Sequence, residues 1–159
     1  WTPAELIDIV PYAAEQYPQL FKQKEVSVLT VAPERTFWEK ATILHHEANR
    51  PEHLSMPQRY SRHYYDLYCM AKSPVKEKAF ERLDLLQKVV DFKMKFYPRA
   101  WARYSEAVSA TLKLIPPSYR LGALQEDYSA MRNMLYGEIP SFETMMAAVG
   151  ELEKEIHAL

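Results

Sequence analysis

The chain has 159 residues, of which 48% are apolar and 26% charged, the balance of a globular domain that buries a sizeable core. Lys and Arg total 20 and Asp and Glu total 21, so the net charge of −1 indicates no nucleic-acid partner by itself. No run approaches the roughly 18 apolar residues of a membrane-spanning helix, which excludes an integral membrane protein. The start of the chain, with Glu5, Asp8 and no basic residue before Val10, is unlike a secretory signal. The single cysteine, Cys69, excludes an internal disulfide and fits a reducing, cytoplasmic setting.

Glycine is scarce and proline is common, with three glycines against eleven prolines. No glycine precedes Gly122, which excludes a Gly-rich phosphate-binding loop or a dinucleotide fingerprint before that point. The scarcity also disfavours a large sheet with tight hairpins, because such turns require glycine.

The prolines divide the chain into predicted elements. Thr2-Pro3 predicts the start of a short helix that reaches Tyr17, and Pro11 is a potential break within it. Residues 25–31 alternate apolar and polar side chains and predict the one strand of the chain. Apolar side chains that recur every three or four residues predict six further helices, over about 33–48, 55–72, 75–97, 99–110, 118–136 and 141–156. Gly137 is expected to cap the fifth of these helices at its C-terminal end.

A single strand cannot satisfy its own backbone groups and must pair with another strand. Either a second copy of the chain supplies that partner, or the rest of the sheet lies upstream and is missing here. The chain begins with Trp1 rather than Met, which fits the second alternative.

Two predicted helices carry charged residues that can meet. Lys40 lies at the edge of the apolar stripe of the 33–48 helix, and Arg59, Arg62 and Asp66 share one face of the next helix. If the two helices pack antiparallel, Lys40, Arg62 and Asp66 approach one another and suit the handling of a triphosphate and a metal ion. The alternative is an ordinary surface pair between Arg62 and Asp66, one helical turn apart, which contributes a few tenths of a kcal/mol.

Four histidines in or between these two predicted helices, His45, His46, His53 and His63, raise the question of a metal site. His45 and His46 are adjacent and diverge by about 100° on a helix, so they do not match the i,i+4 spacing of a helical zinc pair. We expect one of them to be exposed and the other to pack in the core. Cys69 lies beside a stripe of tyrosines and is expected to be buried and inert.

The stretch 88–104, KVVDFKMKFYPRAWARY, combines basic and aromatic side chains and contains one acidic residue. Such a combination can grip a phosphate backbone and stack on bases. The alternative is the end of an amphipathic helix whose lysines extend over an aromatic core. The sequence is compatible with both.

Two blocks of sequence carry a resemblance to a known family. They are PERTFWEK over residues 33–40 and RYSRHYYDLY over residues 59–68, with Leu44-His45 and Arg50-Pro51 between them. Together with FYPRAW over residues 96–101 and Pro117-Tyr119-Arg120-Leu121, they resemble the AbiEii/AbiGii nucleotidyltransferase toxins of type IV toxin–antitoxin, or abortive-infection, systems. The resemblance extends over nearly the whole chain.

The resemblance implies a mainly α fold, in which a helical bundle follows a short strand left from a truncated polymerase-beta-like α+β domain. Residues 1–32 would be the remnant of the catalytic domain and residues 33–159 the helical domain. Lys40 matches the family lysine that contacts the nucleotide triphosphate, Asp66 matches the aspartate of the R-x-x-x-D-L block, and Arg62 matches the basic residue before it. The family's first motif, Gly-Ser followed by paired acids, has no counterpart here and is expected upstream of Trp1.

The function that the resemblance implies is the transfer of a nucleotide from an NTP, with Mg²⁺, to a cellular acceptor such as tRNA. Lys40 and Asp66 are the expected catalytic residues, and the expected substrate-binding residues are Arg59, Arg62, Lys93 and Arg99. The partners would be NTP, tRNA and a cognate antitoxin, without a membrane. Because the paired acids are missing, this part of the protein is expected to bind no cofactor and to be inactive alone. Two alternatives are a non-catalytic helical module that binds RNA or a protein partner, and a purely structural helical domain.

Overall fold

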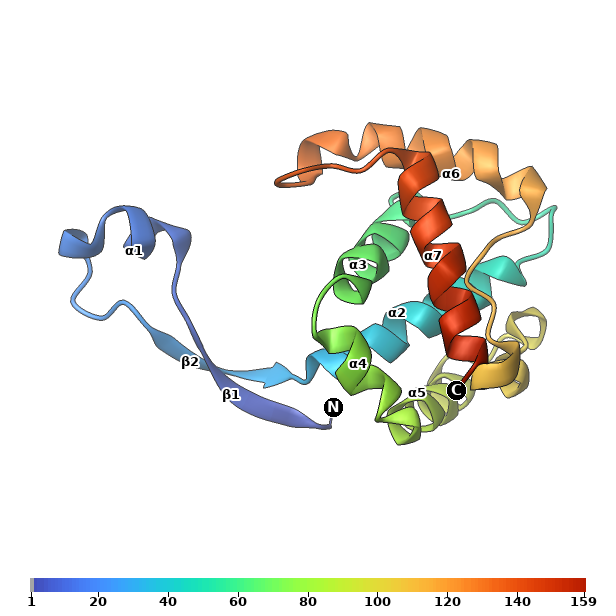
Figure 1. Cartoon of the computed structure of the whole chain (residues 1–159), viewed down its shortest axis with the longest axis horizontal. Helices are drawn as coiled ribbons and strands as arrows, with labels where there is room; N and C mark the ends of the chain where they lie inside the picture. The colour runs from blue at the N-terminus through green and yellow to red at the C-terminus, as the bar shows by residue number, and fades with distance from the viewer. Residues whose placement is uncertain (1) are drawn as a thin grey trace.

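The computed structural model describes residues 2–159 and consists of a two-stranded hairpin that extends from a body of helices (Figure 1). The strands are β1 (Ala4–Ile9) and β2 (Val26–Val31). The α-helices are α1 (Tyr12–Gln16), α2 (Pro33–Ala48), α3 (Ser61–Ala71), α4 (Val75–Phe80), α5 (Leu83–Phe96), α6 (Ser118–Ala130) and α7 (Phe142–His157). Short 3-10 helices are η1 (Pro18–Leu20), η2 (Ala100–Ala102), η3 (Tyr104–Glu106), η4 (Ser109–Thr111) and η5 (Arg132–Met134). The prediction of a mainly α fold is confirmed.

The hairpin corrects two predictions about the first 32 residues. The strand predicted at 25–31 is confirmed, but the helix predicted from Pro3 is wrong over residues 4–9, which form β1. Its part after Pro11 is present as the short α1. The two strands pair antiparallel, with Leu6 opposite Leu29 and Ile7 opposite Val28. β2 thus finds a partner within the chain, and the expectation that its neighbour had to come from elsewhere is also wrong.

Helix α2 lies at the centre of the helical body and packs against α3, α4 and α5. Phe37, Ala41 and Leu44 lie on the predicted stripe of this helix and are completely buried. Because they recur at spacings of four and three residues, they form one continuous apolar side. Trp38 lies next to them, and its indole N–H donates to the Ala79 carbonyl of α4 at 3.0 Å. The apolar core of the protein therefore forms around α2.

Several loops differ from the predicted helices. The predicted 99–110 helix is replaced by η2, η3 and η4, and the predicted 118–136 helix ends at Ala130. Gly137 has a positive φ of 77°, but it lies in the turn after η5 rather than at the end of α6. His45 of α2 holds the first of these loops, because its ring nitrogens bond the Arg103 carbonyl at 3.1 Å and accept the Lys113 N–H at 3.0 Å. Such contacts replace the helical hydrogen bonds that the loop lacks.

Helix α3 begins at Ser61 and not near Ser55 as predicted, and a side chain from α6 caps it. The Asp127 carboxylate accepts the backbone N–H of Arg59 at 2.6 Å and that of Ser61 at 2.9 Å, and it also accepts the Ser61 hydroxyl at 2.5 Å. Arg59 adopts a left-handed conformation, with φ of 62°, just before the helix. The carboxylate satisfies N–H groups that a helix start leaves unpaired, and its charge suits the positive end of the helix dipole.

No helix in the described part of the chain is both long enough and apolar enough to cross a membrane.

We expect Asp127→Ala to lower the free energy of unfolding by about 3 kcal/mol, because it leaves a buried hydroxyl and two backbone N–H groups without their acceptor. Urea denaturation followed by circular dichroism measures this change. Glu126→Ala, at the neighbouring exposed position of α6, is the matched control and should change stability by less than about 0.5 kcal/mol. Equal effects of the two substitutions would contradict the capping role of Asp127.

Candidate functional site

The predicted approach of Lys40 and Asp66 is confirmed in the structure. The Lys40 ammonium on α2 donates to Asp66 Oδ2 on α3 at 2.6 Å. The Lys40 side chain is 21% exposed and that of Asp66 is 39% exposed, so solvent and a ligand can reach the pair. Because the Lys40–Asp66 ion pair is partly exposed, it contributes little to the free energy of folding. Its main effect is to fix the position of the Lys40 ammonium.

The predicted pair between Arg62 and Asp66 is not formed. Within residues 2–159 Arg62 makes no ion pair, and its side chain is exposed. The i,i+4 pair is lost because the Asp66 carboxylate faces Lys40 on the neighbouring helix instead. Arg62 still acts on the site through its charge, since it lowers the pKa of the adjacent His63.

His63 is the third member of the Lys40 cluster. Its Nδ1 lies 3.3 Å from the Lys40 ammonium, which can only donate, so Nδ1 accepts and the neutral ring carries its proton on Nε2. Burial lowers the pKa of His63 to about 4, and repulsion from Lys40 and Arg62 acts in the same direction. At neutral pH the ring is therefore an uncharged acceptor that orients the ammonium. The sequence carried one signal for this role, the i,i+3 spacing between His63 and Asp66.

Lys93 of α5 lies close to this cluster. Its ammonium donates to the Glu39 carbonyl at 3.1 Å, one residue before Lys40. Lys93, expected to bind substrate, turns inward and is partly buried. The cause is the apolar stripe of α5, in which Leu86, Val89 and Val90 precede Lys93 at helical spacing.

The other two predicted substrate-binding residues lie outside this cluster. Arg59 lines an open pocket of about 690 Å³ between the 55–59 loop and α6, where its backbone is held by Asp127. Arg99 is exposed and lines a smaller pocket of about 260 Å³ at the end of α5. The structure thus brings Lys40, Asp66 and Lys93 together around α2, and it separates Arg59 from them.

The C-terminal end of α2 carries a second polar cluster, which the sequence did not reveal. Buried Glu47 accepts two hydrogen bonds from Arg50, at 2.7 and 2.8 Å, and the Arg50 guanidinium lies 4.7 Å from the centre of the Trp101 ring. His46 stacks on the same indole at 4.4 Å. Burial lowers the pKa of His46 to about 4, and the charges of Arg50 and Lys93 act in the same direction. This cluster fixes the end of the helix that presents Lys40.

The stretch 95–99 forms an exposed patch of basic and aromatic side chains. Phe96 and Tyr97 are 56% and 60% exposed, and the Lys95 ammonium lies 5.3 Å from the centre of the Phe96 ring. Arg99 follows two residues after Tyr97. We name these four residues, Lys95, Phe96, Tyr97 and Arg99, the 95–99 patch. Its aromatics are exposed rather than part of the core.

The described residues do not form a site for a metal ion. Within residues 2–159, no three His, Cys, Asp or Glu side chains gather where they could hold one. Mg²⁺ prefers several oxygen ligands, whereas Asp66 already accepts from Lys40. These residues therefore do not fit a Mg²⁺ ion by themselves. Cys69, predicted to be buried, is exposed because its helix turns the tyrosines toward the core.

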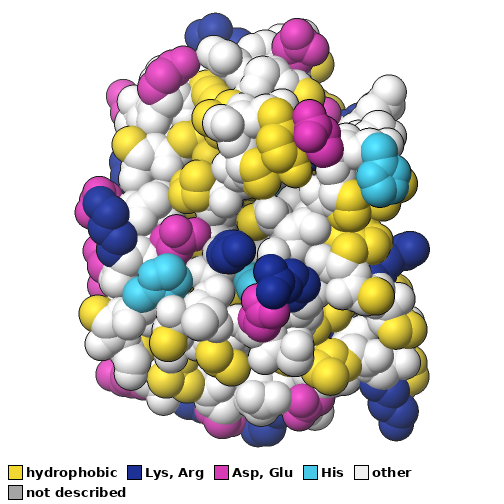
Figure 2. All heavy atoms as spheres, turned by 90° about the vertical axis from the view of Figure 1, so that its right-hand side faces the viewer, with side chains coloured by type: hydrophobic (Ala, Val, Ile, Leu, Met, Phe, Trp, Pro, Cys, Tyr) yellow, Lys and Arg dark blue, Asp and Glu magenta, His cyan; other side chains and the backbone are white. Residues whose placement is uncertain are grey.

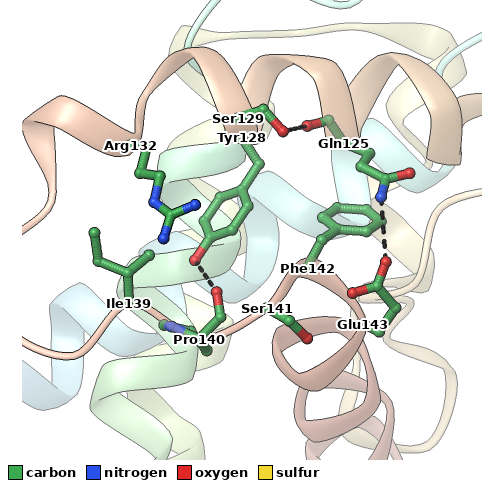
Figure 3. A pocket seen from close by; sticks show the side chains of 9 residues that line it. All are labelled: Gln125, Tyr128, Ser129, Arg132, Ile139, Pro140, Ser141, Phe142 and Glu143. Carbon is green, nitrogen blue, oxygen red and sulfur yellow. Dashed lines mark hydrogen bonds between the residues drawn. The ribbon is translucent and has the colours of Figure 1, made fainter.

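A further pocket, of about 450 Å³, lies between α6 and the segment that leads into α7 (Figure 3). Tyr128 donates to the Pro140 carbonyl at 3.0 Å, and Gln125 donates to Glu143 at 3.2 Å across the opening. Arg132 extends toward Ile139 beside them. None of the predicted site residues lines this pocket, and its polar groups largely bond one another across the helix junction.

The face of the helical body that points away from the hairpin is mixed in charge (Figure 2). Basic, acidic and histidine side chains lie close together near its centre, with apolar atoms around them. This face is therefore not one continuous basic surface.

We expect the free energy of unfolding to fall as pH decreases from about 6.5 to about 4. His46 and His63 stay neutral in the folded chain until pH is near 4, whereas in the unfolded chain they bind protons below the usual value of 6.5. Each shift corresponds to roughly 3 kcal/mol. Urea denaturation across this pH range measures the slope, which His46→Gln with His63→Gln should reduce. His53→Gln, at an exposed loop position, should leave the slope unchanged; an unaltered slope in the double variant would contradict the assignment.

Comparison with protein families identifies one family for this chain. Residues 1–148 match the family described as nucleotidyl transferase AbiEii toxin, type IV TA system. The match includes both helices of the Lys40 cluster and the end of α5 that bears Lys93. Comparison with curated proteins and with solved structures gave no match. Because the family match covers most of the chain, the protein belongs to the AbiEii family of nucleotidyltransferase toxins.

Proposed function

We propose that the chain is the C-terminal part of a nucleotidyltransferase toxin that transfers a nucleotide from an NTP to a cellular acceptor such as tRNA. The observation that carries the proposal is the cluster in which Lys40 of α2 bonds Asp66 and His63 of α3, at a position that solvent reaches. A fixed ammonium of this kind suits the binding of a triphosphate.

In the proposed reaction a hydroxyl oxygen of the acceptor attacks the α-phosphorus and its proton passes to solvent, while the bond between the α-phosphorus and the oxygen that bridges it to the β-phosphate breaks to release pyrophosphate. Negative charge grows on the leaving pyrophosphate as that bond breaks. Lys40 would bind these phosphate oxygens and offset the charge, while Asp66 and His63 hold the ammonium in place before the NTP arrives. The cluster thus supplies a pre-oriented positive charge.

The hairpin supports the proposed division into residues 1–32 of a catalytic domain and residues 33–159 of a helical domain. Leu6 and Leu29 form an exposed pair on one face of the hairpin, and Ile7 and Val28 form another on the opposite face. A sheet that is apolar on both faces is typical of an interior position between two layers. In this proposal the catalytic domain covers the hairpin and supplies the carboxylates that hold Mg²⁺.

The family also bears on partners and setting. A type IV toxin–antitoxin family implies a cognate antitoxin for the toxin. We place the protein in an abortive-infection system in the cytoplasm, since tRNA and NTP are both found there.

We expect Lys40→Ala to lower kcat/KM for transfer of a labelled NTP by about 10²–10³-fold in the protein that contains the catalytic segment, because a preoriented charge at the transition state is lost. Lys40→Arg keeps the charge in a different geometry, so its kcat/KM should lie between the values of the wild type and of Lys40→Ala. The assay follows labelled nucleotide on the acceptor.

Lys78→Ala is the matched control, since Lys78 is an exposed lysine on α4. It should leave kcat/KM within about twofold of the wild-type value, because it removes one surface charge away from the cluster. Transfer at the wild-type rate by Lys40→Ala would remove Lys40 from the mechanism.

A second candidate function, a helical module that binds RNA without catalysis, rests on the 95–99 patch. Two exposed aromatic rings beside two basic side chains suit the stacking of bases and the contact of phosphates. A structural role alone does not require apolar rings of this size in solvent.

We expect tRNA affinity to fall with salt, because phosphate contacts release counterions. Replacement of Lys95 and Arg99 by Ala should reduce the slope of log K against log salt by about 0.7 for each charge removed. Filter binding at several salt concentrations measures the slope, and Lys154→Ala on α7 is the control. An affinity that does not depend on salt would exclude this function.

A further inference from the structure

Lys93 is a partly buried ammonium without an acidic partner. Its hydrogen bond in the structure goes to an uncharged group, the Glu39 carbonyl, at 3.1 Å. Among residues 2–159 it forms no ion pair, and the nearby Glu39 carboxylate accepts from Arg35 at 3.0 Å. The ammonium therefore has N–H donors to spare for an incoming acceptor.

Lys40 of α2 is the positive group that acts on Lys93. Burial and, to a smaller extent, the charge of Lys93 lower the pKa values of His46 on α2 and His63 on α3 to about 4, so both rings are uncharged at neutral pH. Glu39 is the acidic group that opposes Lys40 at Lys93, and Asp66 is already bound to Lys40. On α5 itself, Asp91 and Lys95 are exposed.

The two remaining charges near this end of the cluster are Arg62 and Arg99. Arg62 acts on His63, and Arg99 acts on His46, so both add to the positive potential. The cluster of α2, α3 and α5 thus holds more cations than anions. Such an excess is relieved either by the loss of a proton or by the arrival of an anion.

The electrostatic setting selects Lys93 as the group that gives up its proton. Burial lowers the pKa of Lys93 to about 7, and repulsion from Lys40 acts in the same direction, while Glu39 opposes the shift. Above that pH most molecules carry a neutral amine at this position. A bound phosphate close by raises the pKa again, because an opposite charge favours the ammonium.

We infer that Lys93 is a proton-linked phosphate ligand, which takes up one proton from solvent when a polyphosphate binds in the cluster of Lys40, His63 and Lys93. The inference rests on the proposed function and adds to it a second phosphate-binding lysine with a pH-dependent charge. Binding then consumes a proton between the pKa values of the free and the occupied site, so affinity falls as pH rises through that range.

Isothermal titration calorimetry of the full 159-residue chain with inorganic tripolyphosphate tests the inference. Titrations at about pH 8 in two buffers of different ionisation enthalpy give the number of protons taken up. Lys93→Arg keeps a permanent positive charge, so it should bind within about threefold of wild type and take up close to one proton fewer. The difference in proton uptake between wild type and Lys93→Arg excludes the protons that tripolyphosphate itself exchanges with the buffer, because these are the same for both proteins.

Two further variants complete the experiment. Lys93→Met removes the charge and should weaken binding about tenfold, in line with the loss of a charge-assisted hydrogen bond. Lys88→Arg is the matched control, because Lys88 is an exposed lysine of the same helix that pairs with Asp84 at 2.8 Å. It should bind tripolyphosphate and take up protons as the wild type does.

The outcomes separate the two proposals. Equal proton uptake by wild type and Lys93→Arg, with binding intact, overturns the inference and leaves the proposed function standing. Wild-type affinity in Lys40→Ala, with uptake still lost in Lys93→Arg, overturns the proposed role of Lys40 and keeps the anion site. Absence of tripolyphosphate binding overturns both.

Discussion

Helix α2 determines how the rest of the structure is arranged, because its successive side chains meet different surroundings. Phe37, Ala41 and Leu44 anchor the apolar core, while Lys40, about 100° away from Ala41 around the axis, faces the charged cluster. Arg35 ties the start of the helix to the hairpin through the Thr2 carbonyl at 2.7 Å. A one-residue change in the phase of α2 would place an ammonium in the core and a core residue in solvent. Core packing therefore also fixes the position of the charge.

The sequence predicted α2, α7 and the Lys40–Asp66 contact because each depends on a long and regular apolar period. It failed at β1 because residues 4–9, AELIDI, follow Thr2-Pro3, which resembles a helix start, whereas the segment that forms β2, VSVLTV, is rich in valine, which favours strands. It also failed for Arg62, because a local i,i+4 pair competes with Lys40, a tertiary partner that local spacing does not reveal.

The segment 99–116 was predicted to begin with a helix but forms 3-10 turns and loops. Its three 3-10 turns are held by His45 of α2 and by Glu153 of α7, which accepts the Ile115 N–H at 3.0 Å. These partners are distant in sequence, so the local composition, which favoured a helix, was overridden by tertiary contacts. Lys93 was more accessible to prediction, because it continues the stripe of Leu86, Val89 and Val90. Its position in this period indicates an inward side chain, while its charge and the neighbouring basic residues suit a phosphate contact.

The hairpin has a practical consequence for work with the isolated chain. Each of its two strands leaves one edge of backbone N–H and C=O groups unpaired, beside exposed Leu6 and Leu29. Such edges are templates on which strands of other molecules add, and native proteins normally cover or charge them. Concentrated preparations of these residues alone are therefore prone to self-association and precipitation, which solubilising charges on the strand edges would reduce.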